Sequence, residues 1–226
     1  MSDLVSVVIP TRDRPEQAEA CVDRCRHVSR GYDVEIIVVT EDMATVRAMA
    51  GTSARICRSE TPLTAPQAWH LGAKIAKGDV LVLGADDLWF YHGWVGETLD
   101  AMATFPDGAG VVGFNDLARD GDDLATHWAV HRRFAIEHLG GSLYPPCYRH
   151  YFGDNEVNAR AKRWDRFVWA RFAIVEHRHP IFGKANVDSL YLEKQAWFED
   201  DRALFEARAK VNFPNVWRPA WLPSDA

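Results

Sequence analysis

Residues 79–90 of the chain read DVLVLGADDLWF, and this stretch indicates how the protein folds. The segment 79–84 is almost continuously apolar, which is typical of a strand that is buried on both faces of a sheet. Asp86 and Asp87 follow directly after the point where that strand ends. In open α/β sheets ligands bind outside the carboxyl ends of the strands, so both carboxylates are expected in a binding crevice.

Similar apolar runs occur elsewhere in the first half of the chain. Strands are predicted at 4–9 (LVSVVI), 34–39 (VEIIVV), 54–57 and 110–114 (GVVGF). Helical spacing of apolar residues predicts a helix that Asp13 caps and Gly31 ends, a helix over 65–77, a helix that carries Trp94, and a helix over 188–210. Buried strands that alternate with helices predict an α/β fold with a Rossmann-like, mostly parallel sheet flanked by helices.

The size of the chain limits the number of its cores. It has 226 residues, of which 47% are hydrophobic. This is enough for one sizeable core but not for two, so we expect a single domain over 1–226, with a regular half at 1–115 and a less regular half at 116–226. The formal net charge of −6 argues against a general basic surface for nucleic acid.

The cysteines and the first residues indicate a compartment. The four cysteines form no C-x-x-C pair, and Cys21 and Cys25 fall one helical turn apart on an apolar face, as core residues do. A chain without a disulfide framework fits a reducing environment. The first residues lack a basic n-region, and no apolar run approaches the roughly 20 residues that span a membrane, so we expect a cytoplasmic location. No feature of the sequence indicates an oligomeric state.

The predicted crevice lacks the glycine loops that often hold phosphate groups. Neither G-x-G-x-x-G nor G-x-x-x-x-G-K-[ST] occurs, and the first strand ends in PTRD (10–13) instead. Carboxylates repel a diphosphate unless a cation stands between them, and hard oxygen ligands favour Mg²⁺ or Mn²⁺. Asp86 and Asp87 are therefore candidate metal ligands. The alternative is that they cap a helix.

Three motifs at strand ends carry a family resemblance. The stretches VSVVIPTRDRP (5–15), VEIIVVTED (34–42) and AKGDVLVLGADD (76–87) resemble the family 2 inverting glycosyltransferases with the GT-A fold. The resemblance covers the first half of the chain well and the second half loosely. It implies a metal-dependent inverting enzyme that moves a sugar from a nucleotide-diphosphate donor, with a UDP-sugar favoured, to an acceptor hydroxyl. Residues 1–115 would bind the nucleotide, and residues 116–226 would bind the acceptor and carry the catalytic group.

The resemblance also implies roles for individual residues. The positions that would hold the donor are Pro10, Thr11, Arg12, Asp13, Glu41, Asp42 and Asp86. Asp86 and Asp87 match the acidic metal-binding element of the family; we expect Asp87 to contact the metal directly and Asp86 to lie nearer the ribose. Two departures stand out, because TEDM (40–43) replaces an acidic-acidic-Gly-Ser motif and Gly84 replaces a further aspartate. The metal site would therefore need a ligand from the second half of the chain.

A histidine pair in EHRHP (176–180) offers that ligand. The pair follows a predicted strand, and many GT-A enzymes complete their metal site with a histidine after a late strand. His177 and His179 would point to the same side of an extended segment, and an imidazole with two carboxylates suits Mn²⁺. We favour His177 over His179. The alternative is a solvated basic turn.

Two further segments of the second half suggest catalytic groups. Inverting transfer needs a base for the acceptor hydroxyl, and the resemblance places it in YFGDNE (151–156), with Asp154 favoured and Glu156 in reserve. The alternative role for Asp154 is to cap a helix. The glycine-containing loop 182–188 would close over the donor and bring Lys184 to the diphosphate, unless Lys184 is an ordinary exposed lysine.

The sequence does not identify the acceptor. The resemblance leaves a carbohydrate, a small molecule or, as in some compact phage members of the family, a modified base in DNA. The basic clusters at 131–133 and 160–166, with aromatic residues among them, are compatible with stacking on a sugar or with binding of nucleic acid. The alternative is a solvated helix face over a Trp-rich core. The acidic net charge makes a nucleic-acid acceptor the less favoured choice. Two other functions compete. A nucleotidyltransferase would usually carry a basic, glycine-rich signature after the first strand, which is missing, and Gly84 is compatible with a non-catalytic nucleotide-sugar-binding domain.

Overall fold

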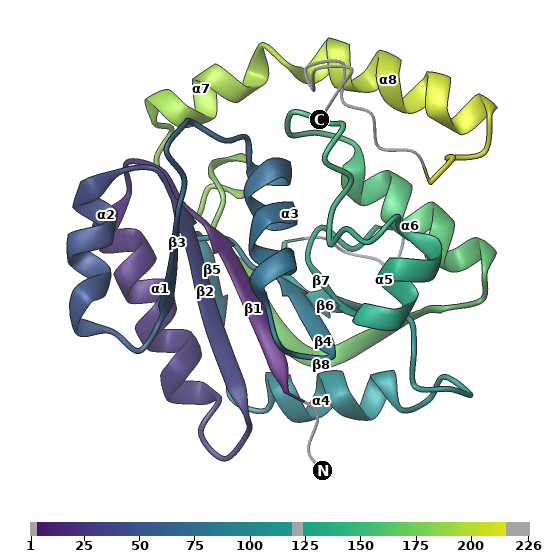
Figure 1. The fold of residues 1–226 in the computed structure, drawn as a ribbon, viewed down its shortest axis with the longest axis horizontal. Helices are drawn as coiled ribbons and strands as arrows, with labels where there is room; N and C mark the ends of the chain where they lie inside the picture. The colour runs from purple at the N-terminus through teal and green to yellow at the C-terminus, as the bar shows by residue number, and fades with distance from the viewer. Residues whose placement is uncertain (1–3, 119–123, 216–226) are drawn as a thin grey trace.

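The computed structural model describes residues 4–118 and 124–215, whose path is drawn in Figure 1. Within these residues the strands join into one 8-stranded sheet with the order β3-β2-β1-β4-β7-β6-β8-β5. The strands are β1 (Val5–Pro10), β2 (Val34–Thr40), β3 (Arg55–Arg58), β4 (Val80–Leu83), β5 (Leu88–Phe90), β6 (Val111–Asn115), β7 (Trp128–His131) and β8 (Phe167–His177). The helices are α1 (Pro15–Val28), α2 (Met43–Ala48), α3 (Ala65–Ile75), α4 (Trp94–Met102), α5 (Arg132–His138), α6 (Gly153–Arg163), α7 (Ser189–Gln195) and α8 (Phe198–Lys210), with short 3₁₀ turns η1 (Met49–Gly51) and η2 (Pro180–Phe182).

The first half of the sheet is parallel and the second half is mixed. Strands β1, β2, β3 and β4 run in one direction, and β8 is parallel to β6. Strand β7 lies antiparallel between β4 and β6, and β5 is antiparallel to β8. The prediction of an α/β fold on a mostly parallel sheet flanked by helices is confirmed. The carboxyl ends of β1, β2 and β4 consequently share one edge.

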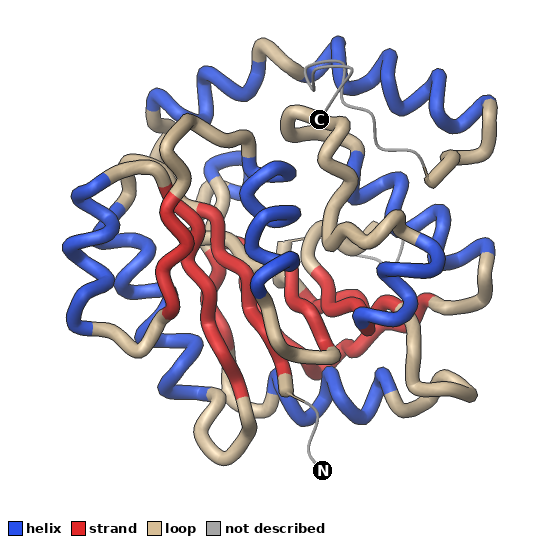
Figure 2. The backbone as a smooth tube through the Cα atoms, viewed as in Figure 1, coloured by secondary structure: helices blue, strands red, loops and turns tan. Residues whose placement is uncertain are grey.

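Helices cover both faces of the sheet (Figure 2). On one face α1 and α4 contribute Cys25 and Trp94 to a core that also contains buried side chains of the strands. On the other face α3 and α5 contribute Trp69 and Phe134. Cys21 and Cys25 are free thiols in the first of these cores, as their spacing predicts.

Helix α3 approaches β1 closely because of a glycine. A Cβ atom on Gly72 would lie 2.2 Å from Cγ1 of Val8 and 3.1 Å from Cγ2 of Val39. These atoms belong to branched side chains in the buried centre of two strands, which cannot move aside. Gly72 therefore sets the distance between α3 and the sheet.

The start of α1 differs from the prediction. Arg14, and not Asp13, occupies the N-cap position, and the helix begins at Pro15. The backbone of Asp13 adopts a positive φ of 57°. This conformation turns the Asp13 N–H toward the carboxylate of Asp42, which accepts its hydrogen bond at 3.1 Å. A contact between two strand ends thus replaces the predicted cap.

The C-terminal segment forms two helices where the periodicity predicts one. Helix α7 ends at Gln195 and α8 begins at Phe198, so two residues separate the helices. Figure 1 shows α7 and α8 lying across the edge at which the parallel strands end. Asp188 caps α7 by accepting the N–H of Tyr191 at 2.8 Å. Throughout the described part of the chain, no helix is long and apolar enough to span a bilayer.

Candidate active site

A cavity of about 390 Å³ lies at the carboxyl ends of the parallel strands. Strand ends of the first half supply Pro10, Thr11, Arg12, Arg14, Glu41, Asp86 and Asp87 to its lining. The second half supplies His127, His150, Asp154, Asn155, His177, His179 and Lys194. The convergence of the first strand end, the second strand end and the Asp86–Asp87 pair is the arrangement that the sequence predicts.

Asp86 and Asp87 come from a turn between two strands. Strand β5 follows them, and its residues Leu88 and Phe90 are buried and pair with β8. The alternative that the two aspartates cap a helix is therefore wrong. The same turn aims both carboxylates into the cavity.

The carboxylate of Asp86 is held by first-half residues. It accepts hydrogen bonds from the hydroxyl of Thr11 at 2.8 Å, from Arg14 at 3.3 Å and from the amide of Gln17 at 3.3 Å. Burial, followed by repulsion from Asp87, raises the pKa of Asp86 to about 6. Both oxygens of Asp86 already accept hydrogen bonds from these residues. Asp86 is therefore better suited to contact a ligand at the end of β1 than to coordinate a metal.

Asp87, His177 and His179 form a group that can hold a metal ion. One ligand atom from each lies within 4.8 Å of the others, and Nε2 of His177 is 3.3 Å from Oδ2 of Asp87. Oδ1 of Asp87 and Nδ1 of His177 are buried without a hydrogen-bond partner among the described residues. A carboxylate with two imidazoles suits Mn²⁺ better than Mg²⁺, which prefers oxygen ligands. The predicted ligands Asp87 and His177 lie together, His179 joins them, and Asp86 lies outside the group.

Burial and neighbouring charges together favour the protonation states of Asp87 and His179 that can coordinate a metal. Burial opposes ionisation of Asp87, but the adjacent His177 outweighs it and holds the pKa of Asp87 below its usual range. Burial, followed by the charge of His177, lowers the pKa of His179 to about 4. An ionised carboxylate and a neutral imidazole are the forms that coordinate metals.

The ring of His127 packs against the ring of His177. The two rings meet edge to face with centroids 4.7 Å apart, and Nδ1 of His127 lies 3.1 Å from the carbonyl oxygen of Leu83. Burial lowers the pKa of His127 to about 4, so the ring is neutral. His127 is a site residue that sequence reasoning missed, because nothing in its local pattern marks it.

Gly84 occupies a position that has no room for a side chain. A Cβ atom at this position would lie 2.7 Å from the carbonyl oxygen of Val8 and 2.9 Å from Cγ1 of Ile9. Strand β1 therefore leaves no room for the further aspartate that the family resemblance implies here.

The end of β2 presents one carboxylate to the cavity. Glu41 lines it, and its Oε1 atom is buried without a hydrogen-bond partner among the described residues, with Nε of Arg12 at 3.9 Å. Burial raises the pKa of Glu41. An N–H group of a ligand would satisfy the buried oxygen.

Two predicted donor-binding residues do not line the cavity. Asp42 caps α2, and its carboxylate accepts hydrogen bonds from the N–H of Thr45 and from the hydroxyls of Thr40 and Thr45. Asp13 lies beside it through the backbone contact described above. The structure therefore gives Asp13 and Asp42 a local role and leaves Glu41 as the polar group that β2 contributes.

Asp154 faces the cavity from the first turn of α6. The N-cap of this helix is Phe152, with φ 66°, so the prediction that Asp154 caps it is wrong. A buried tyrosine shapes the turn, since the Tyr144 hydroxyl accepts the N–H of Gly153 at 2.9 Å and donates to the carbonyl of His150 at 2.8 Å. The carboxylate is thus carried by a well-supported helix start.

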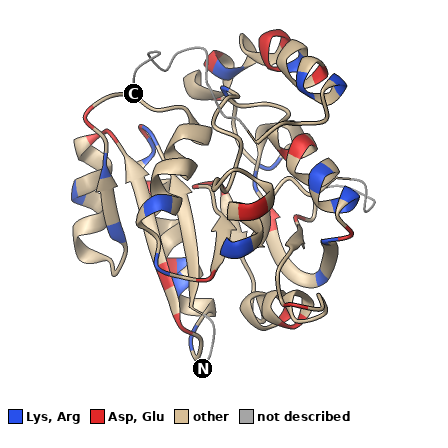
Figure 3. Cartoon of the chain, turned by 45° about the vertical axis from the view of Figure 1, so that its right-hand side comes forward, with Lys and Arg blue, Asp and Glu red and all other residues tan. Residues whose placement is uncertain are grey.

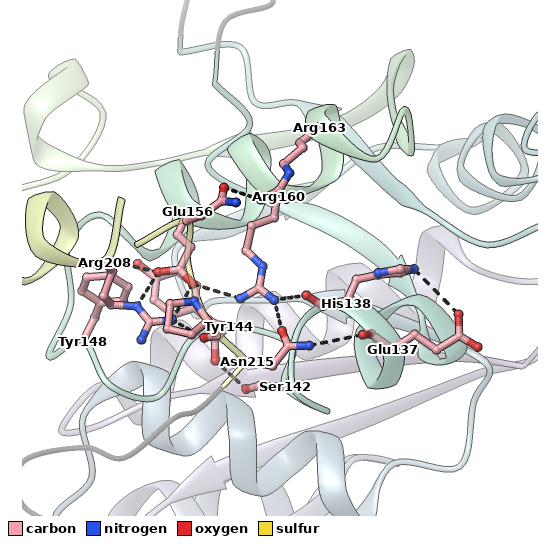
Figure 4. A network of polar contacts seen from close by, with 12 residues as sticks. Glu137, His138, Ser142, Tyr144, Tyr148, Glu156, Arg160, Arg163, Arg208 and Asn215 are labelled. Atoms are coloured by element: carbon pink, nitrogen blue, oxygen red, sulfur yellow. Dashed lines mark hydrogen bonds and ion pairs between the residues drawn. The ribbon is translucent and has the colours of Figure 1, made fainter. Parts of the chain in front are cut away.

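Glu156 has a structural environment and lies outside the cavity lining. It is fully buried, and its oxygens bind Tyr148 and Arg208 at 2.8 Å and Arg160 at 3.1 Å (Figure 4). Arg160 also donates to the carbonyl of His138 and to Asn215. A carboxylate enclosed by these partners cannot reach an acceptor hydroxyl, so the reserve prediction for Glu156 is wrong and Asp154 remains the candidate base.

The Glu156→Gln variant is expected to destabilise the fold by about 3–5 kcal/mol, because it leaves the guanidiniums of Arg160 and Arg208 without their buried counter-charge. Urea unfolding measures this change. Glu199→Gln is the matched control: Glu199 pairs with Arg202 at the surface, so its loss should change the free energy of unfolding little. Equal stability of the two variants would contradict a structural role for Glu156.

The lysine that reaches the cavity is not the predicted one. Nζ of Lys184 binds the carbonyl of Leu117 at 3.0 Å and the carboxylate of Glu176 at 2.9 Å, and Lys184 does not line the cavity. Lys194 of α7 does. The apolar spacing of 188–210 predicts a helix, but it does not indicate which strand ends that helix crosses.

A family model described as glycosyl transferase family 2 matches residues 6–164. No curated protein matches the sequence. His177, His179 and Lys194 all lie beyond the matched segment.

Solved structures show the same fold at low sequence identity. A mannosyltransferase from Pyrobaculum calidifontis, in complex with GDP-Man and Mn²⁺, has a TM-score of 0.70 at 15% identity; the match covers 94% of this chain and 65% of that one. Glucosyl-3-phosphoglycerate synthase from Mycobacterium tuberculosis, in complex with UDP, has a TM-score of 0.66 at 16% identity, covering 92% and 80%. Mannosyl-3-phosphoglycerate synthase from Rubrobacter xylanophilus has a TM-score of 0.62 at 13% identity, covering 98% and 79%. The chain thus spans about two thirds of the length of the first of these proteins.

Proposed function

The chain belongs to glycosyl transferase family 2, and from this premise we propose that it is a metal-dependent inverting glycosyltransferase. It moves a sugar from a nucleotide-diphosphate donor to an acceptor hydroxyl. One observation carries the proposal: a single cavity is lined both by the Asp87–His177–His179 group and by Asp154. We propose a single domain in which residues 1–115 bind the nucleotide and residues 116–226 bind the acceptor.

Asp87, His177 and His179 would hold the divalent cation, with Mn²⁺ preferred over Mg²⁺ for this donor set. A cation bound there supplies positive charge to the diphosphate and to the nucleoside diphosphate that leaves. The structural neighbours support this assignment, because the mannosyltransferase from Pyrobaculum calidifontis is described in complex with GDP-Man and Mn²⁺.

The donor nucleotide would lie across the ends of β1 and β2. The Asp86 carboxylate, which accepts a hydrogen bond from Thr11, would accept a ribose hydroxyl. Glu41 is placed to accept an N–H of the base. Uracil and guanine both carry such a ring N–H; we favour a UDP-sugar, and a GDP-sugar is the alternative.

Asp154 would act as the base of the transfer. Its carboxylate takes the proton of the acceptor hydroxyl while that oxygen forms a bond to the anomeric carbon of the donor sugar. The bond from the anomeric carbon to the diphosphate oxygen breaks, and the oxygen keeps the electron pair. Attack opposite to the departing group inverts the anomeric centre.

The acceptor would enter from the side of α6 and α8. A carbohydrate or small molecule is favoured over a modified base of phage DNA. Figure 3 shows Lys and Arg interspersed with Asp and Glu along the outer helices, in keeping with the net charge of −6. Such a mixed surface offers little general attraction for a polyanion. A cytoplasmic location is part of the same proposal.

A donor-turnover assay tests the function. The purified chain is incubated with UDP-sugars and GDP-sugars and Mn²⁺, with and without a chelator. Release of nucleoside diphosphate that the chelator abolishes supports the proposal. Release of pyrophosphate would instead indicate a nucleotidyltransferase, and absence of turnover with every donor would favour a non-catalytic nucleotide-sugar-binding domain.

The Glu41→Gln variant is expected to bind UDP about tenfold more weakly, because the uracil N–H loses a buried hydrogen bond to a charged group. Its affinity for CDP is expected to equal that of the wild type, since cytosine has no N–H at its ring N3. Calorimetric titration with each nucleotide measures the difference. Glu60→Gln, at an exposed carboxylate, is the control. An equal loss for UDP and CDP would refute a base contact by Glu41.

A further inference from the structure

Among the described residues, one Lys or Arg side chain in the lining of the cavity has no hydrogen-bond or ion-pair partner. Among the described residues, the Lys and Arg side chains in its lining are Arg12, Arg14 and Lys194. Arg12 pairs with Glu193 at 2.5 Å, and Arg14 pairs with Asp188 at 2.5 Å. No hydrogen bond or ion pair of the Lys194 ammonium occurs within 4–118 and 124–215. Its positive charge is therefore available to a ligand.

The surroundings of Lys194 identify the kind of ligand. Lys194 lines the same cavity as Asp86 and Asp87. Burial lowers the pKa of Lys194, and the charges of the two carboxylates act against that effect. A diphosphate that entered here would be repelled by both carboxylates, and a cation beside them would offset that repulsion.

Helix α7 fixes the position of Lys194 relative to the end of β1. The Arg14–Asp188 and Arg12–Glu193 ion pairs join this helix to the loop that follows β1. They lie at its two ends, since Asp188 is the N-cap and Glu193 stands in the last turn. Lys194 follows directly and is held over the same strand end.

Helix α8 holds the other end of the segment. Asp201 is 2% exposed, and its carboxylate accepts the backbone N–H groups of Arg149, His150 and Tyr151 at 2.8–2.9 Å. Further along, Arg208 binds the buried Glu156 (Figure 4). These contacts fix α7 in position against the rest of the fold.

We propose that Lys194 binds the diphosphate of the donor and stabilises the negative charge that grows on it as the sugar departs. The inference rests on the proposed function and names a residue of its donor site. An ammonium is a compact charge with three hydrogen-bond donors, which suits phosphate oxygens. It donates hydrogen bonds and keeps its protons throughout, so the bond changes are those of the transfer itself.

The Lys194→Met variant tests the proposal. Its affinity for UDP or GDP, whichever the wild type binds, is expected to fall about tenfold, because a charge-assisted hydrogen bond is lost. The kcat of transfer is expected to fall about 100-fold, since the contact strengthens as charge develops. Its affinity for Mn²⁺ without nucleotide should not fall, because Lys194 is not a ligand and its positive charge opposes a cation at Asp87.

Three further measurements make the outcome decisive. Lys210→Met removes an exposed lysine of α8 and should leave binding and rate unchanged. Lys194→Arg should restore part of the nucleotide affinity, which a purely structural role would not predict, and circular dichroism confirms that each variant is folded. A folded Lys194→Met that binds nucleotide and transfers sugar like the wild type overturns the inference alone. A wild type that turns over no donor overturns the proposed function instead.

Discussion

Replacing Asp154 with asparagine is expected to lower the kcat of sugar transfer about a thousandfold while the affinity for the donor nucleotide stays unchanged. General base catalysis commonly contributes about 100- to 10,000-fold, and an amide of the same shape cannot accept the acceptor's proton. Asp154 lines the cavity but lies outside the Asp87 metal group, so donor binding does not depend on it. Steady-state kinetics and calorimetric titration of the same preparation measure both quantities.

The matched control for this variant is Asp165→Asn. Asp165 is exposed just after the other end of α6, and its backbone φ of 54° is one that asparagine adopts readily. This control should transfer sugar at the wild-type rate. An Asp154→Asn enzyme of near wild-type rate would show that another group takes the proton.

The Asp87→Asn variant is expected to lose Mn²⁺ affinity by more than about 100-fold and transfer activity by about a thousandfold. Asp87 is the carboxylate in a group whose other members are histidines, and its Oδ1 atom is buried without a partner among the described residues. A neutral amide is a much weaker ligand for a divalent cation. Titration of Mn²⁺ monitored by electron paramagnetic resonance measures the first effect, and the transfer assay measures the second.

The neighbouring Asp86→Asn variant separates the two carboxylates. Asp86 is bound by Thr11, Arg14 and Gln17 and lies outside the metal group. Its variant should keep most of its Mn²⁺ affinity in the absence of nucleotide and should bind nucleotide more weakly. If both variants lose the metal to the same extent, the division of roles between Asp86 and Asp87 is wrong.

The sequence predicts the parallel part of the fold because burial on both faces leaves an apolar run. The predicted strands at 4–9, 34–39 and 110–114 correspond closely to β1, β2 and β6. The antiparallel strands β5 and β7, of 3 and 4 residues, are not predicted from the sequence. The position of Asp86 and Asp87 at a strand end follows from the same apolar runs.

Side chains whose roles depend on distant partners are harder to predict. Glu156 has the residue type and the neighbourhood of a catalytic base, but Arg208, 52 positions later, encloses it. Lys184 lies in a loop with the composition of a lid, yet Glu176 and Leu117 bind it outside the cavity. Lys194 becomes a site residue only because ion pairs to Arg12 and Arg14 bring α7 to β1. These contacts are tertiary, so the periodicity of the sequence does not predict them.

The contact of Asp201 with the turn at 149–151 has a consequence for the order of events during synthesis. Strands β1 to β4 can pair as soon as they leave the ribosome, at roughly 5–20 residues per second. The N–H groups of Arg149, His150 and Tyr151, by contrast, find their acceptor only after residue 201 has emerged. The nascent protein would thus form the parallel part of its sheet first and fix the 149–151 turn, which precedes α6 and Asp154, last.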